Sequence, residues 1–471
     1  MASHPDVPHF HPQPQLQPST TDIENQPEKK HDENAMPIDE QKAESVPYRQ
    51  DAFGDESNAE VKYKVLKWWQ CGLLMVAETI SLGILSIPAA IAGLGLVPAI
   101  LILLGMGLVA SYTGYIIGQF KWAYPHVVSM ADAGEVLMGP VGREILFGGQ
   151  MLFLIFLMAS HILTFTVAMN TLTGYAVCSI IFGVVGLVVS LGFSLPRTLK
   201  NMAWLSLGSF ISIFTAVVIA MIAIGIENPN ADGPVKATTE TNLVTGFTSA
   251  LNIILSYASH NAFFNVIAEL KEPRDFPKAL TLLQSIDISL YLVAGVVIYY
   301  FAGETVSSPA LGSMSPLVSK VAYGIALPTI IIAGVINGHI ACKSIYTRLF
   351  AGTNTMAKRD FKAVGSWIGI AVALWIVAWI IAMAIPVFSN LLSLMTALFA
   401  SWFSFSLPAA FWLFMNRGRW FESPRKIALL CVNLGIFGMG VVMCALGLYA
   451  SGKAIHDNPA GDSFSCAANN A

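Results

Sequence analysis

The hydrophobic pattern of the sequence contains three long blocks with almost no charged residues. Block 68–120 contains a single acidic residue, Glu78, and blocks 145–196 and 363–416 contain no Asp, Glu, Lys or Arg. A helix that crosses a bilayer needs about 20 apolar residues, so each block is long enough for two helices. Each block also has a turn signal near its middle, namely GLGLVP at 93–98, NTLTGY at 170–175 and IPVFSN at 385–390. The pattern therefore predicts three helical hairpins.

Five further apolar stretches are each long enough for one membrane span. They lie at about 201–226, 244–268, 279–303, 321–347 and 427–451. Together with the hairpins they predict an all-α, multi-pass membrane protein, with eleven transmembrane helices in a single transmembrane domain at 65–451. The composition agrees, because the chain is 55% hydrophobic and only 12% charged, whereas soluble domains carry about 25% charged residues.

The distribution of Lys and Arg predicts how the chain is oriented. These residues are enriched in the cytoplasmic loops of membrane proteins. If the N-terminus is cytoplasmic, the outer segments hold Lys236, Lys320 and Lys453, and most other Lys and Arg residues lie in inner segments. An odd number of spans then makes the C-terminal tail at 452–471 extracellular. Residues 1–60 are rich in Pro, Gln, Glu and Asp, which predicts a disordered cytoplasmic tail.

Several classes of protein are disfavoured by what the sequence lacks. The six cysteines form no CxxC pair, and we interpret them as small buried hydrophobic residues rather than as disulfides or metal ligands. A net charge of -3 without a clustered basic face gives no support for nucleic-acid binding. No Walker A, HExxH or strand-to-helix GxSxG motif is present. We therefore expect neither an enzyme nor a cofactor, and the expected partners are the lipid bilayer and a small substrate.

Two predicted spans contain stretches that are unfavourable for a continuous helix. The first holds ETISLGILSIP at 78–88, and the sixth holds SYASHN at 256–261. Transporters built from inverted repeats bind substrate at discontinuous helices in corresponding positions of their two halves. We therefore expect interrupted helices at positions one and six of a five-plus-five repeat, with the eleventh helix added. The alternative is that these small residues only allow close packing between helices.

An interrupted helix offers chemistry that suits an amino acid. Unwinding frees backbone groups, which a membrane protein tolerates only where they face a cavity or other protein. Freed N–H groups at a helix N-terminus favour a carboxylate, and freed carbonyls with a nearby hydroxyl favour an ammonium group. Gly83 is expected to supply the backbone freedom for the first break. Two facing breaks can therefore hold one zwitterion.

The same two stretches resemble motifs of the amino acid/auxin permease family. SLGILSIP at 81–88 is similar to the first-helix motif G-x-G-I-L-x-[IL]-P, with Ser81 in place of the first Gly. SYASHNAFFNVIAEL at 256–270 is similar to the sixth-helix motif, although Ser259 replaces a Gly. The residues that match the sixth-helix motif are Tyr257, His260 and Glu269.

The resemblance extends from about 65 to 450 and is closest to the fungal neutral amino acid permeases. The segment SMADAGEVLMGPVGR at 129–143 also resembles the loop between the second and third helices of the family. The resemblance implies a leucine-transporter-like fold and proton-coupled amino acid uptake by alternating access. Helix eight packs on helix one in this fold, so Asn337 and His339 in the eighth span are further candidates. The expected substrate-binding residues are Thr79, Ser81, Gly83, Ile84, Ser256, Tyr257, Ser259, His260, Phe263 and Asn337.

Titratable residues at membrane depth are costly and are usually functional. The expected proton-coupling residues are Glu78, His260, His161 and His339, of which Glu78 is the first choice because it precedes the expected break. Each has an alternative role as a static hydrogen-bonding group, and for His260 the alternative is a neutral ring bonded to a freed carbonyl. We expect Asp287 in the seventh span to be structural.

The expected substrates are neutral aliphatic and aromatic amino acids. No acidic cluster or Arg lies at the breaks to pair with a charged substrate side chain. Phe263 and Phe264 follow the second break, where they face either a substrate pocket or lipid. The expected function is proton symport across the plasma membrane. A vacuolar amino acid transporter and an amino acid sensor that transports little are the alternatives.

Overall fold

The computed structural model describes residues 64, 66–196, 202–231, 233–350, 361–457 and 463–466. These residues belong to one compact unit, Arg49–Ala471. The second unit, Met1–Tyr48, and the predicted tail at 1–60 lie outside the described residues, as do parts of the predicted C-terminal tail at 452–471.

The described chain is helical. The long elements are α1 (Trp68–Leu94), α2 (Leu96–Ala123), α3 (Met130–Thr173), α4 (Ser179–Ser194), α5 (Met202–Glu227), α6 (Leu243–Leu255), α7 (His260–Ala268), α8 (Phe276–Ala302), α9 (Pro316–Phe350), α10 (Phe361–Ala384), α11 (Phe388–Met395), the π-helix η6 (Thr396–Ser406), α12 (Leu407–Met415) and α13 (Pro424–Asp457). The short 3-10 helices are η2 (Pro273–Asp275), η3 (Gly303–Thr305) and η4 (Ala310–Gly312).

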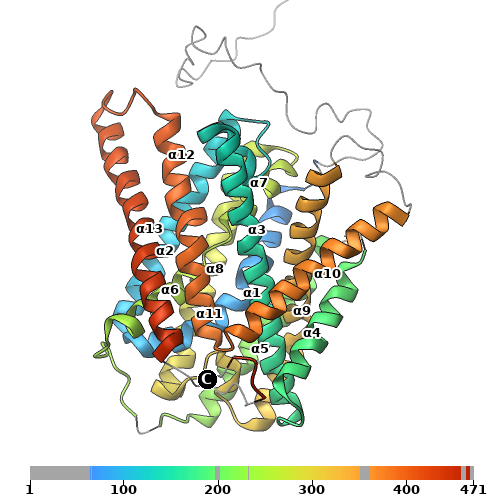
Figure 1. The fold of residues 1–471 in the computed structure, drawn as a ribbon. Coiled ribbons are helices and arrows are strands. Elements are labelled where there is room, and N and C mark those ends of the chain that lie inside the picture. Colours follow the sequence, from blue (N-terminus) through green and yellow to red (C-terminus); the bar gives the residue numbers. More distant parts are fainter. Residues whose placement is uncertain are drawn as a thin grey trace, which may run out of the picture. The chain divides into compact units, whose positions relative to one another are not determined.

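These elements form eleven membrane spans. Nine helical segments in the described ranges are long and apolar enough to cross a bilayer, with α11, η6 and α12 forming one of them. The shorter apolar helix α4 adds a span, and α6 with α7 forms another. The predicted all-α, multi-pass architecture is therefore confirmed. Figure 1 shows the spans side by side, with α12 and α13 at one edge of the bundle and α4 and α10 at the other.

The turns of the predicted hairpins lie where the sequence places them. Gly95 separates α1 from α2 and has a φ of 84°. Gly174 follows α3 in the left-handed conformation, with a φ of 66°. Glycine adopts these positive φ values without the steric cost that a Cβ imposes, so both helices end at their glycine.

The two halves of the bundle correspond helix by helix. Four of the five pairs of helices in equivalent positions contact each other. These pairs are α1 with α6, α2 with α8, α3 with α9 and α4 with α10. The third member of each half is also its longest segment: α3 spans 44 residues with a break at Gly139, and α9 spans 35. This arrangement agrees with the expected five-plus-five repeat, to which α13 is added.

The sixth span is interrupted and the first is not. Residues 256–259 separate α6 from α7, as predicted. In contrast, α1 is one α-helix that runs through Ser81, Gly83 and Pro88, so the expected break at 78–88 is wrong. The hydroxyls of Ser81 and Ser86 donate to carbonyls three residues earlier in α1, which satisfies these polar groups without unwinding the helix. Residues 80–88 are buried inside the bundle rather than facing lipid.

The tenth span contains a π-helix that the sequence did not predict. Eleven residues, Thr396–Ser406, connect α11 to α12 with this wider winding. The π-helix packs against α13, α2, α6 and α7. Such segments are rare and are often found at functional sites, and this one faces both parts of the interrupted sixth span.

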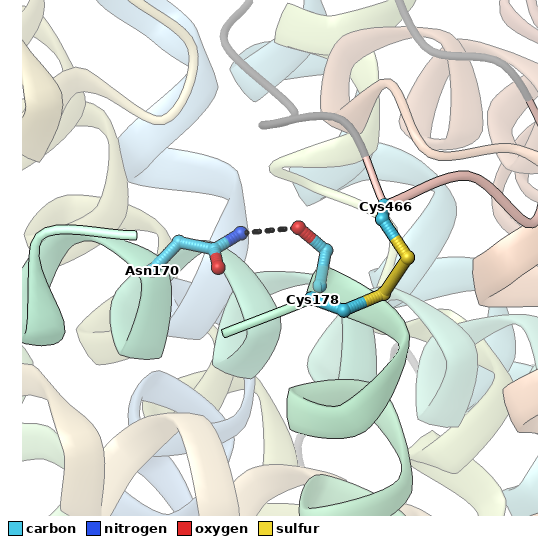
Figure 2. The surroundings of a disulfide bond; sticks show 4 residues. Asn170, Cys178 and Cys466 are labelled. Carbon is cyan, nitrogen blue, oxygen red and sulfur yellow. Dashed lines mark hydrogen bonds between the residues drawn. A yellow bond between two sulfur atoms is a disulfide. The ribbon is translucent and has the colours of Figure 1, made fainter. Parts of the chain in front are cut away.

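The expectation that no cysteine forms a disulfide is wrong for two of the six. Cys178, between α3 and α4, is bonded to Cys466, which follows α13 (Figure 2). Next to it, the Asn170 side-chain amide donates to Ser179 Oγ at 2.9 Å. A separation of 288 residues hides this pairing in the sequence. The remaining cysteines are free, and of these Cys71 and Cys342 are buried as expected.

Candidate functional site

The two stretches that the sequence selects lie against each other in the structure. A Cβ atom added at Gly83 of α1 would lie 2.6 Å from Ser256 Oγ and 2.8 Å from Ser256 Cα. Ser256 is the first residue after α6 and begins the interruption. Gly83 is therefore needed for close approach to the interrupted span, and not for unwinding of its own helix as expected.

Tyr291 of α8 joins α1 to the same interruption. Its hydroxyl lies 3.0 Å from the carbonyl oxygen of Ser256 and 3.2 Å from that of Thr79. This hydroxyl therefore links α8, α1 and the end of α6 at one point. The sequence analysis missed Tyr291. The signal that could have found it is the run of polar residues at 284, 287 and 291, which share one helix face in a membrane span.

The interruption lies deep in the protein. Ser256, Tyr257, Ser259 and His260 are all buried. The chain turns through hydrogen bonds of the 3-10 type, in which the N–H groups of residues 256–258 donate three residues back. The first N–H groups of α7 have no carbonyl of their own helix to bond, so this end of α7 can attract negative charge.

His260 makes its contacts with α2. Its Nε2 atom lies 3.0 Å from both the Ala110 carbonyl oxygen and Thr113 Oγ1. Because the Thr113 hydroxyl itself lies near the carbonyls of Val109 and Ala110, the pattern suits an Nε2–H donor. This geometry matches a neutral ring that fixes α7 against α2.

Glu78 and its neighbours occupy the buried side of α1. Glu78 is half-buried, and its carboxylate has no hydrogen bond or ion pair within the described residues. The Ser81 hydroxyl donates to the Glu78 carbonyl, and the Thr79 hydroxyl donates to the Met75 carbonyl. Ile84 is fully buried. Among the candidates on α1, Gly83 and the Thr79 carbonyl are the groups with direct links to the interruption.

The candidates on α3 and α9 make contacts elsewhere. His161 Nδ1 lies 2.9 Å from the Ile330 carbonyl oxygen of α9. The Asn337 amide donates to the Ala333 carbonyl in its own helix. The His339 ring lies 5.2 Å from the Trp367 ring of α10. The contacts of both histidines are therefore with α9 and α10.

The two phenylalanines after the interruption belong to an aromatic cluster. Phe263 lies 4.7 Å from the His260 ring and 5.6 Å from the Phe276 ring, measured between centroids. Phe264 packs on Phe120 and Phe411. Both side chains are 0% exposed, so the alternative that they contact lipid is wrong.

The two ends of the bundle differ around α1 and the sixth span. At the end that holds the disulfide, a cavity of about 620 Å³ is lined by α1, α6, α11 and α13. Its polar lining includes Ser249, Asn252 and Asn390. At the opposite end, Leu66 pairs with the backbone after α7, accepting from Lys271 N–H and donating to the Glu269 carbonyl, each at 3.0 Å. This pairing joins the start of α1 to the segment that follows α7 and closes this end of the bundle.

Comparisons with known proteins identify relatives of this chain. Residues 64–452 match the family described as transmembrane amino acid transporter protein. An N amino acid transport system protein of Neurospora crassa is 34% identical over 446 residues, which cover 91% of this chain and 95% of that relative. A transmembrane transporter of Gibberella moniliformis is 29% identical over 75% of this chain and 76% of its own. A solved Na+-coupled sialic acid symporter is 13% identical, with a TM-score of 0.49 over 84% of this chain and 91% of that structure.

Proposed function

Because this chain belongs to the transmembrane amino acid transporter protein family, we propose that it imports neutral amino acids into the cytosol together with protons. The observation that carries the proposal is the buried interruption between α6 and α7, which lies directly against Gly83 of α1. The N–H groups that begin α7 suit the substrate carboxylate. Carbonyls and hydroxyls at residues 256–259 suit its ammonium group.

The surroundings of the interruption support a neutral substrate side chain. The described residues that touch it include Gly83, Tyr291, Thr113 and the aromatic cluster around Phe263. None of them carries a cationic side chain for an acidic substrate, and none offers an exposed carboxylate for a basic one. The description of the Neurospora relative as an N amino acid transport system protein agrees with an amino acid substrate.

The difference between the two ends supports alternating access. The cavity at the disulfide end gives a route toward Asn252, one turn before the interruption. The backbone pairing of Leu66 with the segment after α7 blocks the other end. Release on that side requires the two segments to separate, and α7 and the start of α1 are the elements that would move.

The disulfide supports an orientation with a cytoplasmic N-terminus. Disulfides persist in oxidising compartments and are rare in the cytosol. Cys178 follows the third span and Cys466 follows the eleventh, so the face that carries them is the outer or lumenal one. We place the protein in the plasma membrane, and imaging of a tagged protein separates this from the vacuolar alternative.

Uptake by the purified protein in liposomes tests the proposal. We expect labelled neutral amino acids to accumulate when the outside is acidic, without sodium, and an uncoupler to abolish the accumulation. Competition by all twenty amino acids then defines the substrate range. Binding without accumulation would contradict transport and favour a sensor, whereas accumulation that needs sodium would contradict proton coupling.

A further inference from the structure

The seventh span carries a buried acid that the site described above does not use. Asp287 of α8 is 0% exposed, and neither of its carboxyl oxygens has a hydrogen-bond partner among the described residues. An ionised carboxylate without a partner is strongly unfavourable in an apolar interior. A group in this position is therefore neutral unless water or another polar group reaches it.

The side chains that face Asp287 connect it to the interruption. Asp287 and Tyr291 are four residues apart on α8, so they lie on the same face of the helix. The rings of Tyr291 and Tyr257 lie 5.4 Å apart, edge to face. Tyr291 is one turn beyond Asp287 on α8 and bonds the Ser256 carbonyl, whereas the Tyr257 hydroxyl has no partner in the described chain.

No described charged side chain forms an ion pair with this acid. The helix α8 packs against α1, α2 and α5. None of the ion pairs between described residues includes Asp287. An ion pair therefore does not explain why an acid is placed here.

A mainly apolar surface groove between α2 and α8 passes beside Gln284, and Asp287 itself does not line it. It has a volume of about 320 Å³ and runs between α2 and α8 from Pro277 to Ile288. Its polar lining includes Ser111, Thr281 and Gln284. Gln284 is three residues before Asp287, so it lies on the same helix face, and its side-chain oxygen also has no partner among the described residues.

From this geometry we propose that Asp287 is the site that carries the coupling proton, and this rests on the proposed function. With α1, α6 and α8 clamped through Tyr291, the acid holds its proton. Opening of the bundle away from the disulfide breaks the clamp and lets water reach the acid. The Asp287 carboxyl then gives its proton to that water and becomes a carboxylate. During the return of the empty carrier, the free Tyr257 hydroxyl donates to the carboxylate.

The first test compares Asp287→Asn with wild type in liposomes. One pH unit is worth about 1.4 kcal/mol, so a one-proton symporter can accumulate its substrate about tenfold per pH unit. We expect Asp287→Asn to lose this accumulation while it still exchanges labelled for unlabelled amino acid. The matched control is Asp275→Asn, which removes a partly exposed acid paired with Lys278 beside the same helix and should accumulate substrate like wild type.

The same panel separates this inference from the proposed function. If wild type does not accumulate amino acid under a pH gradient, the proposed function is wrong. If wild type and Asp287→Asn accumulate it equally, with the same pH dependence, only the role of Asp287 is wrong. Loss of coupling in Glu78→Gln but not in Asp287→Asn would assign the proton to Glu78 instead.

A measurement on the wild-type chain covers the case in which the variant does not fold. Among the described residues, Asp287 is the aspartate that is buried within a membrane span. Infrared difference spectra of protein labelled with carbon-13 aspartate should show an isotope-shifted band of a protonated carboxylic acid at neutral pH. This band should weaken when the carrier is driven into its open form. Absence of a protonated aspartate at neutral pH would overturn the proposal.

Discussion

At the residue scale, the site depends on a contact that leaves no space for a side chain. Gly83 has no room for a Cβ because Ser256 already occupies that position. The sequence selected both residues as candidates but assigned Gly83 the wrong physical role. Backbone flexibility and close approach both select glycine, and a sequence alone does not separate them. The contact with Ser256 on the sixth span shows that close approach is the reason for glycine at position 83.

Substitutions at this contact should therefore act through overlap. We expect Gly83→Ala to lower thermal stability, because overpacking a tight contact costs about 1–3 kcal/mol, and Gly83→Val to abolish transport as well. Ser256→Gly in the Gly83→Ala background should restore part of the thermal stability, because the close contact with the Cα of residue 256 remains. Gly105→Ala on α2 is the control, because no atom lies within 4 Å of its added Cβ. Unchanged unfolding and uptake in Gly83→Val would place the site elsewhere.

Tyr291 allows a substitution of a single atom. Tyr291→Phe removes the hydroxyl shared by Ser256 and Thr79 and leaves the ring in place. We expect a loss of stability of about 1 kcal/mol, typical of one hydrogen bond, together with slower uptake because α1 and the interruption are no longer tied. Thermal unfolding and initial uptake rates measure the two effects. Tyr300→Phe, at an exposed position of the same helix, should change neither.

At the element scale, the sequence predicts the spans better than their interruptions. A span needs enough apolar residues to cross the bilayer, and this requirement can be checked for each segment separately. Whether a helix unwinds depends on what its neighbours offer. Ser81 and Ser86 in α1 find acceptors within their own helix, whereas residues 256–259 turn away from α6 and give one carbonyl to Tyr291. The π-helix at Thr396–Ser406 likewise has no local sequence signal that we could read.

The disulfide is an element-scale link that local patterns do not reveal. It ties the turn between α3 and α4 to the segment after α13. A disulfide that closes a long loop stabilises a protein by about 2–4 kcal/mol, so Cys466→Ser should lower the midpoint of thermal unfolding. Cys431→Ser, which removes an exposed free cysteine, is the control. Equal midpoints for wild type and Cys466→Ser would show that the link does not contribute to stability.

At the scale of the whole molecule, the charges of the loops and the disulfide support the same proposed orientation. Most of the described Lys and Arg residues between the spans lie on the face opposite the disulfide. The positive-inside rule places these residues in the cytoplasm, and oxidising conditions place the disulfide on the other side. These arguments are independent, because one depends on loop charge and the other on the redox state of a compartment.

Sealed plasma-membrane vesicles of both orientations test this arrangement. A membrane-impermeant reductant followed by an impermeant thiol reagent should label Cys178 and Cys466 in right-side-out vesicles and leave them unlabelled in inside-out ones. Cys71 and Cys342 are buried and should stay unlabelled in both, which controls for unfolding. The opposite labelling pattern would invert the molecule, so that the cavity at the disulfide end would open to the cytosol. An inward proton gradient would still drive import by a symporter in that orientation, so this result would contradict the orientation and leave the coupling untouched.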